Sequence, residues 1–597
     1  MFAKKNVAAT LIIGLFIVTT GFGQSLEENW SDFLHFTRIG RFNLASGYAQ
    51  AVLQSNPDPA ALLALAEANP QGYSILLKVN DAAPDAQLAE LSGKLLAIIE
   101  QGRFIRRADP KIIAEEIRRL SSTARGRLAA VKRLQNAGEY AIMYMLDAIA
   151  DNSRKDELPN IIWALPQIGK DAIRPLAASL QTDNIGVKAE VIKAMGKIGY
   201  PQSLAYLKYI TENDESAELR TLADQSIGEI DPAAAQIPAA RLFYRLAEDY
   251  YYSTPSLAPA EDADFANVWF WDSAAGRLVR EKVDKIYFNE LMAMRCCEWA
   301  LKADEGFGQA IGLWLASYFK AESTGVEMPG YFGDGHADAF VYATTAGPEY
   351  LHQALARAIK DNNAYVALGA VEALATIAGE KSLLYRIGPD QPLAQALSFG
   401  DRAVRYSAAI AIAAAGPKEH FAENRLVVEI LVEALALGSE DTEENSGFAD
   451  QQLADSYALR AVGVMLSLAE TQNPVIDLSA AQKALINATR DKRTQIQMLA
   501  ARVLAQLNTP DAQRAIAAMA LAENNPMDIR ISAFESLVIS AKVNANLLDD
   551  QTIDALYSLV SSKDIDPVLQ SSAASAYGSL NLPSRKVKDL ILDQSRS

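Results

Sequence analysis

The sequence predicts an all-α fold, a right-handed α-solenoid of stacked helical hairpins, on three observations. Gly138, Gly169, Gly199 and Gly228 lie 31, 30 and 29 residues apart, and the last three each follow an isoleucine. An apolar run of helical length that ends on an acidic residue follows each of the first three glycines. A period of about 30 residues with two helical runs and two breaks is typical of stacked helical hairpins. We expect these glycines to end helices in the left-handed conformation.

The composition fits a folded stack of helices. Half of the 597 residues are hydrophobic and 22% are charged, which excludes wholesale disorder. The 73 acidic and 56 basic residues give a net charge of −17, which disfavours a protein that coats nucleic acid. Cys296 and Cys297 are the two cysteines and are adjacent in sequence. We therefore expect buried thiols, and stability that comes from helix stacking instead of disulfides.

The N-terminus has the pattern of an export signal. Lys4 and Lys5 precede an apolar run over residues 7–18, and small residues follow at Gly21 and Gly23. The sequence predicts a signal peptide over residues 1–23 and an exported protein, periplasmic or associated with the cell surface. The alternative is an anchor formed by an uncleaved N-terminal segment. We predict no integral membrane segment in the mature chain.

Residues 24–102 are predicted to form an N-terminal helical cap, followed by regular repeats over residues 103–232. The start of these repeats is basic, with ten Lys or Arg and three Asp or Glu between Arg103 and Arg133. Glutamates at spacings of three and four neutralise part of this charge on a helix face. The alternative is a docking patch for an acidic protein, polymer or phosphate-bearing ligand. The candidate residues of this basic patch are Arg106, Arg107, Arg118, Arg119, Arg125 and Arg127.

The repeat segments resemble a known family. The runs WALPQIGKDAIRPLAASLQTD and KAEVIKAMGKIGYPQSLAYLKYITEND are similar to HEAT repeats of the short bacterial type, which also occur in phycobilisome-lyase-like proteins. That pattern has an Asp in the turn between repeats and a Val-Arg pair in the next helix. Asp401 with Val404-Arg405 and Asp528 with Ile529-Arg530 match it, whereas Asp183 is followed by Val187-Lys188. The whole chain resembles uncharacterised exported bacterial HEAT-repeat proteins, and the resemblance implies a scaffold or binding surface.

Residues 233–350 are predicted to form an aromatic-rich central helical segment, either an insertion or degenerate repeats. They lack the 30-residue spacing and contain 21 of the 47 aromatic residues. The consecutive tyrosines 250–252 on one helix cannot all be buried, so at least one is expected to be exposed. Exposed aromatic side chains are suited to anchoring a partner, although they also fill gaps in a core. The candidate partner-binding residues are Trp269, Trp271, Tyr331, Phe332 and His336.

One short motif carries potential metal ligands. Asp334, His336 and Asp338 alternate along a glycine-rich loop, and alternation in an extended strand would place them on one face. We interpret the motif as a surface turn in which the Asp side chains bond to their own backbone, and assign no metal. A metal site, or ligand contact without a metal, is the alternative. The sequence contains no HExxH, CxxC, GxSxG or P-loop pattern. We therefore assign no catalytic residue and no cofactor.

HEAT-like repeats are expected again over residues 351–437, where glycines recur at a longer spacing. A polar acidic loop follows over residues 438–450, which we expect to be disordered. C-terminal HEAT-like repeats and a cap are predicted over residues 451–597.

These observations favour a non-enzymatic exported scaffold or adaptor that binds another macromolecule, above all a protein, through a solenoid surface. The first alternative is an enzyme or small-ligand binder with its site in residues 240–350. The second is an envelope structural component that associates with copies of itself.

Overall fold

The computed structural model describes residues 25–82, 85–259, 264–333, 335–438, 451–562 and 564–595. The segment predicted as a signal peptide, Asp334 and nearly all of the predicted acidic loop lie outside these residues. The chain forms two compact units. Unit 1 comprises residues 1–235 and 260–281, and unit 2 comprises residues 236–259 and 282–597.

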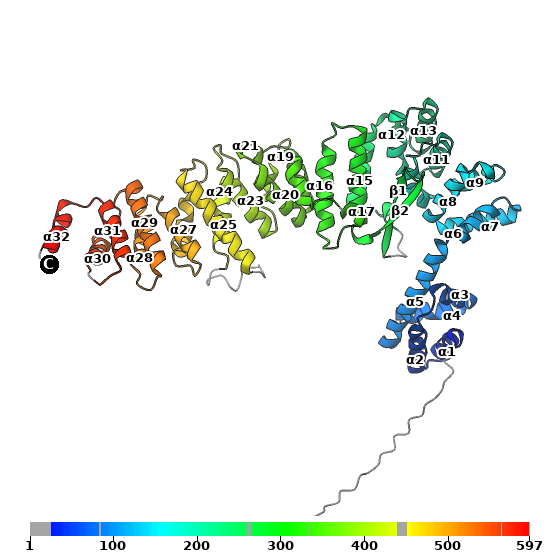
Figure 1. The fold of residues 1–597 in the computed structure, drawn as a ribbon, viewed down its shortest axis with the longest axis horizontal. Coiled ribbons are helices and arrows are strands. Elements are labelled where there is room, and N and C mark those ends of the chain that lie inside the picture. Colours follow the sequence, from blue (N-terminus) through cyan, green and yellow to red (C-terminus); the bar gives the residue numbers. More distant parts are fainter. Residues whose placement is uncertain are drawn as a thin grey trace, which may run out of the picture. The chain divides into compact units, whose positions relative to one another are not determined.

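Unit 1 begins with five helices around one apolar core, with Phe33, Leu62 and Leu88 fully buried. Eight more α-helices follow in the described part of unit 1, and neighbouring helices pack as hairpins (Figure 1). The helices of unit 1 are α1 (Leu26–Arg38), α2 (Phe42–Gln54), α3 (Pro59–Ala68), α4 (Pro70–Ala82), α5 (Ala86–Arg107), α6 (Pro110–Arg119), α7 (Ala124–Ala137), α8 (Glu139–Ala150), α9 (Leu158–Ala164), α10 (Ile173–Ser179), α11 (Ile185–Ile198), α12 (Ser203–Asn213) and α13 (Ala217–Ile230).

The repeated glycines end helices at three of the four expected positions. Gly138, Gly169 and Gly199 have positive φ angles of 57°, 81° and 71°, and each lies between two helical segments. Only Gly199 adopts the left-handed helical conformation, because the ψ angles of the other two are strongly negative. The prediction for Gly228 is wrong, since α13 continues through it to Ile230. That helix ends before Pro232, because proline disfavours helical backbone at the preceding residue.

The predicted all-α class has one exception in the described residues, a two-stranded sheet of β1 (Phe265–Asp272) and β2 (Arg277–Asp284). The aromatic run of β1 favours an extended, half-buried strand. A carboxylate oxygen of Asp272 accepts hydrogen bonds from the backbone amides of residues 274 and 275, which fixes the turn. β1 packs against α10 of unit 1.

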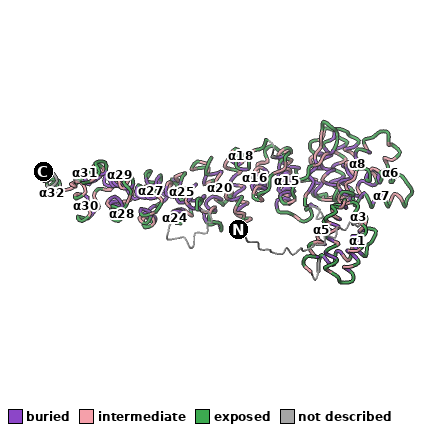
Figure 2. The backbone as a smooth tube through the Cα atoms, turned by 60° about the horizontal axis from the view of Figure 1, so that its bottom comes forward, coloured by how far each residue is buried: buried purple, intermediate pink, exposed green. Residues whose placement is uncertain are grey.

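Unit 2 is a row of helices in which each hairpin packs on the next (Figure 1). Buried residues follow the facing sides of these helices, and exposed residues cover their outer turns (Figure 2). Its helices are α14 (Ala239–Tyr251), α15 (Phe288–Ala303), α16 (Gln309–Glu322), α17 (Gly330–Gly333), α18 (Ala339–Ala346), α19 (Pro348–Asp361), α20 (Ala364–Ile377), α21 (Glu380–Leu383), α22 (Pro392–Ala396), α23 (Arg402–Ala415), α24 (Asn424–Leu435), α25 (Gln451–Glu470), α26 (Gln482–Ala488), α27 (Thr494–Leu504), α28 (Pro510–Leu521), α29 (Met527–Asn544), α30 (Asp550–Ser561), α31 (Pro567–Ser579) and α32 (Ser584–Ser595).

The Asp and Val-Arg pattern has a structural cause. Asp401 caps α23 by accepting a hydrogen bond from the amide of Val404, and Arg405 Nη1 donates to the carbonyls of Phe399 and Gly400 at 3.0 and 3.1 Å. Arg405 is the fourth residue after the helix cap. In other repeats, the side chain at this same position also donates a hydrogen bond to a backbone carbonyl at the end of a preceding helix. The donors are Arg127, Arg220, Gln497, Arg530 and Gln570.

Two details of the predicted pattern differ. Asn184, not Asp183, caps α11, and Lys188 forms an ion pair of 3.1 Å with Asp214 instead of bonding a carbonyl group. Asp528 lies in the first turn of α29, where its charge favours the helix N-terminus.

Within the described residues, no helix combines the length and apolar character needed to cross a membrane.

Candidate functional site

The predicted partner-binding residues lie in two separate places. Trp269 and Trp271 lie on β1 of unit 1, whereas Tyr331, Phe332 and His336 lie in unit 2 at and after α17. We therefore describe the two groups separately.

The Trp269 side chain makes its contacts within unit 1. Its side chain is 3% exposed, and its indole nitrogen donates a hydrogen bond of 2.8 Å to Glu139 Oε2. Asn267 Nδ2 donates to Glu139 Oε1 at 2.6 Å and to the hydroxyl of Tyr140 at 2.7 Å. Glu139 also lies 3.7 Å from Arg174. These bonds fasten the β1 strand to α8, and Trp271 beside it is half-buried.

Cations and rings surround Tyr140 on the same face. Arg280 Nη1 donates a hydrogen bond of 3.1 Å to Asn267 Oδ1, and its guanidinium lies 4.8 Å from the centre of the Tyr140 ring. Phe104 meets the edges of Tyr140 and Phe265 at centroid distances of 5.4 and 5.0 Å. Burial raises the pKa of Tyr140 above its ordinary value. These side chains pack β1 against α8, and the buried Trp269 ring has no exposed face that a partner could contact.

The second group forms a cluster of rings on α16, α17 and α18. His336 stacks on Phe332 with centroids 4.8 Å apart and planes 17° apart. Tyr318 meets Phe332 edge-on at 5.1 Å, and Trp314 meets Tyr342 at 5.1 Å. The structure therefore unites two predicted residues with three that the sequence analysis did not select.

The outer side of this cluster faces solvent. Tyr331 and Phe340 are each 38% exposed and Val341 is 47% exposed, and His336, which lies between them in the sequence, is also exposed. Trp314 and Tyr342 are half-buried beneath. We call these residues, Trp314, Tyr331, His336, Phe340, Val341 and Tyr342, the aromatic patch. Exposed aromatic side chains gathered in one short segment of the chain are suited to anchoring a partner.

Hydrogen bonds fix the patch from below. Trp314 Nε1 donates to Glu298 Oε1 at 3.1 Å, and the hydroxyl of Tyr318 donates to the carbonyl of Ala337 at 2.7 Å. The amide of Ala339 donates to Glu322 Oε1 at 2.8 Å. Burial raises the pKa of Tyr318 to about 12 and also raises the pKa of Glu322. Trp314 and Tyr318 are thus held in place by hydrogen bonds within unit 2.

The candidate metal ligands of the sequence analysis have other roles where the structure describes them. Asp334 lies outside the described residues, the ring of His336 stacks on Phe332, and Asp338 caps α18 through the amide of Val341 at 2.9 Å. In the described ranges no group of three or more His, Cys, Asp or Glu side chains is arranged to hold a metal ion.

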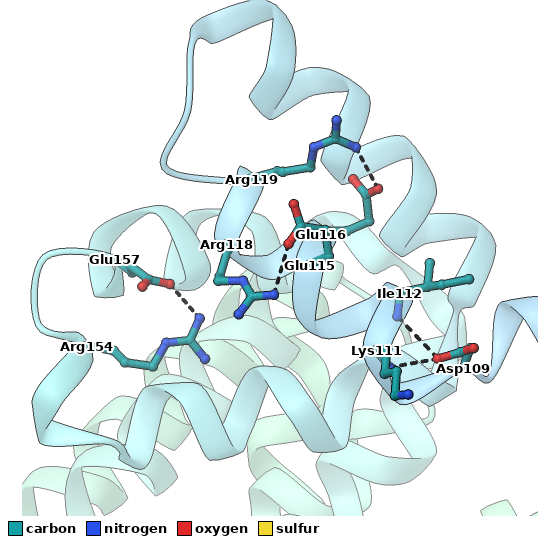
Figure 3. A network of polar contacts seen from close by, with 9 residues as sticks. All are labelled: Asp109, Lys111, Ile112, Glu115, Glu116, Arg118, Arg119, Arg154 and Glu157. Carbon is teal, nitrogen blue, oxygen red and sulfur yellow. Dashed lines mark hydrogen bonds and ion pairs between the residues drawn. The ribbon is translucent and has the colours of Figure 1, made fainter.

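The predicted basic patch is largely engaged in contacts within unit 1. Arg118 pairs with Glu115 at 2.9 Å, and Arg119 pairs with Glu116 at 3.1 Å (Figure 3). Arg106 bonds Glu67, Arg107 lies over the ring of Tyr140, and Arg127 bonds the carbonyl of Leu120. Arg125 is exposed.

Of the three consecutive tyrosines, one is exposed, as expected. Tyr250 and Tyr251 are buried and Tyr252 is 46% exposed. Tyr252 accepts a hydrogen bond of 2.8 Å from Arg357 Nη1, and Arg357 Nη2 donates to Tyr244 at 2.8 Å and to Glu248 at 2.7 Å. This cluster ties α14 to α19 in unit 2.

Sequence reasoning missed Trp314, Tyr342 and Phe340. Trp314 and Tyr318 are four residues apart on α16, a spacing that places both side chains on one face of the helix. Phe340 and Tyr342 lie within the segment that was predicted as a loop, where α18 begins after its cap Asp338; that Asp was the available signal of a helix start.

One family model matches part of the repeat region. Residues 142–228 match the family model of HEAT repeats. Among curated proteins, no significant match to this chain is found. Among solved structures the chain is similar to importin beta crystallised in a polyethylene glycol condition, at 13% identity over 95% of this chain and 68% of that chain, with a TM-score of 0.27. It is similar to Uso1-2 at 14% identity over 96% of this chain and 87% of that chain, with a TM-score of 0.26. The chain is an α-solenoid that contains HEAT repeats in α8 to α13.

Proposed function

We propose that this chain is a non-enzymatic scaffold that binds a protein partner through the aromatic patch of unit 2. The observation that carries this proposal is the cluster in which the exposed His336 meets Tyr342 and Tyr342 meets Trp314, with the exposed Tyr331 and Phe340 in the same segment. Interfaces draw most of their affinity from a few aromatic anchors that lose water on binding. Because the rings are already ordered, a partner bears little cost for ordering them.

The proposal includes export. Two lysines and an apolar run at the N-terminus support a signal peptide over residues 1–23, with the mature chain in the periplasm or at the cell surface. It also assigns the repeats to the short bacterial type, because Asp401 and Arg405 match that pattern.

Site-specific photo-cross-linking tests the binding role. A photoreactive phenylalanine analogue replaces Phe340 in one chain and the exposed Glu535 of α29 in a matched control. In an envelope fraction we expect one protein species to cross-link from position 340 and not from position 535. Its yield should fall when His336→Ala is added. Cross-links to copies of the same chain would instead support self-association, and equal labelling from both positions would contradict the proposal.

A further inference from the structure

The rim of the aromatic patch is acidic and lacks compensating cations. Glu298 and Asp338 are exposed and Glu322 is half-buried, and each already accepts one hydrogen bond from the patch or its helices. Within the part of unit 2 that the structure describes, no ion pair joins any of the three to Lys or Arg. Other carboxylates of unit 2 do have such partners, as Glu290 has Lys320 at 2.9 Å and Glu248 has Arg357 at 2.7 Å.

The nearby sequence strengthens this negative field. Residues 282–350 contain five Lys or Arg and ten Asp or Glu, a net charge of −5. All five cations are already engaged; Lys320, for example, pairs with Glu290, and Lys302 lies 4.7 Å from the ring centre of Trp299. An acidic partner would be repelled here, whereas a basic one would be attracted.

We propose that the partner presents a segment with exposed Arg or Lys side chains to the aromatic patch, an inference that rests on the function proposed above. The faces of aromatic rings attract cations, and guanidinium groups also stack on them. Carboxylates beside the rings then accept the N–H groups of the same cation. Glu298 and Glu322 are placed for this, because Glu298 touches Trp314 and Glu322 holds the start of α18.

The pre-set geometry favours recognition of a cation over general apolar adhesion. Trp314 is fixed by its hydrogen bond to Glu298, and His336 is fixed by its stack on Phe332. A neutral apolar segment would bury these rings but would also desolvate the carboxylates without pairing them, which costs free energy. A segment with Arg or Lys covers the rings and also pairs with the carboxylates.

A random library of 12-residue peptides displayed on phage, selected on the full chain, tests the inference. We expect the enriched peptides to carry Arg or Lys. Their Kd should rise by about tenfold, within the range for two weakened ion pairs, when Glu298→Gln and Glu322→Gln are combined. Glutamine keeps the oxygen that accepts from Trp314 or Ala339, so the patch itself is preserved. The matched control is Glu523→Gln with Glu535→Gln, two exposed acids after α28 and on α29, and its Kd should stay within about twofold of the unsubstituted chain.

A third variant separates this inference from the proposed function. His336→Ala with Phe340→Ala removes exposed rings and should also weaken binding. If that variant loses the peptides but the Glu298/Glu322 variant does not, or if the enriched peptides are neutral or acidic, the cationic partner is wrong while the surface stands. If neither variant alters binding, or no peptide is enriched, both proposals fail.

Discussion

The indole nitrogen of Trp269 donates a hydrogen bond of 2.8 Å to Oε2 of Glu139, a carboxylate 130 residues earlier in the chain. Trp269→Phe keeps the ring but removes the donor, so we expect the β1–β2 hairpin to open more easily, by about 1–3 kcal/mol. Hydrogen exchange of the amides in residues 265–272 measures this. Trp271→Phe is the matched control and should have little effect; equal exchange in the two variants would contradict the role of Trp269.

The Arg405 side chain should stabilise the junction between α22 and α23. Arg405→Met keeps most of the side-chain length but leaves the carbonyls of Phe399 and Gly400 without this donor. We expect the free energy of local opening of α23 to fall by about 1–2 kcal/mol, measured by hydrogen exchange. Arg425→Met on the exposed side of α24 is the control. Equal opening free energies in the two variants would show that water bonds these carbonyls as well as the guanidinium does.

Among the residues that hold α14 against α19, we expect Arg357 to cost the most stability when it is substituted. Its guanidinium bonds Tyr244, Tyr252 and Glu248 and is largely buried. Arg357→Met removes every one of these donors, and we expect a loss of about 2–4 kcal/mol in the local opening free energy of α19. Arg357→Lys should recover only part of it, because an ammonium group lacks the planar fork. Full recovery by lysine would mean that charge alone matters at this position.

His352 should make unit 2 sensitive to mild acid. Its side chain is fully buried, its Nε2 lies 2.8 Å from the carbonyl of Ser382, and burial lowers its pKa below 6.5. Below pH 6.5 the unfolded chain binds a proton that the folded chain does not. Stability should therefore fall as the pH drops from 6.5 toward the folded-state pKa, by at most about 1.4 kcal/mol per pH unit. His352→Gln should remove this slope from urea unfolding curves between pH 7.5 and pH 5, and an unchanged slope would assign it to other groups.

The local pattern of the sequence was sufficient to predict the solenoid, because glycine spacing and apolar runs act within one repeat. It failed at Gly228, where the Asp231–Pro232 step, not the glycine, ends the helix. It also failed for the hairpin, because Phe265–Asp272 becomes a strand through contacts with α8 and α10 that lie more than 80 residues away.

The candidate site was predicted only in part. Phe332 and His336 are close in sequence and meet in the structure, whereas Trp314 reaches them from α16 through tertiary packing. Trp269 and Trp271 stood out by composition alone, and composition does not distinguish a buried indole bonded to Glu139 from an exposed anchor.

The affinity of the partner identified by cross-linking, measured by biolayer interferometry, tests the central claim most directly. We predict that His336→Ala with Phe340→Ala raises the Kd at least about tenfold, the effect of losing interface anchors worth more than about 1.4 kcal/mol. Trp271→Phe on the unit 1 hairpin should leave the Kd unchanged. A Kd that is the same for the unsubstituted chain and the His336/Phe340 variant would contradict the claim that this scaffold binds its partner through the aromatic patch.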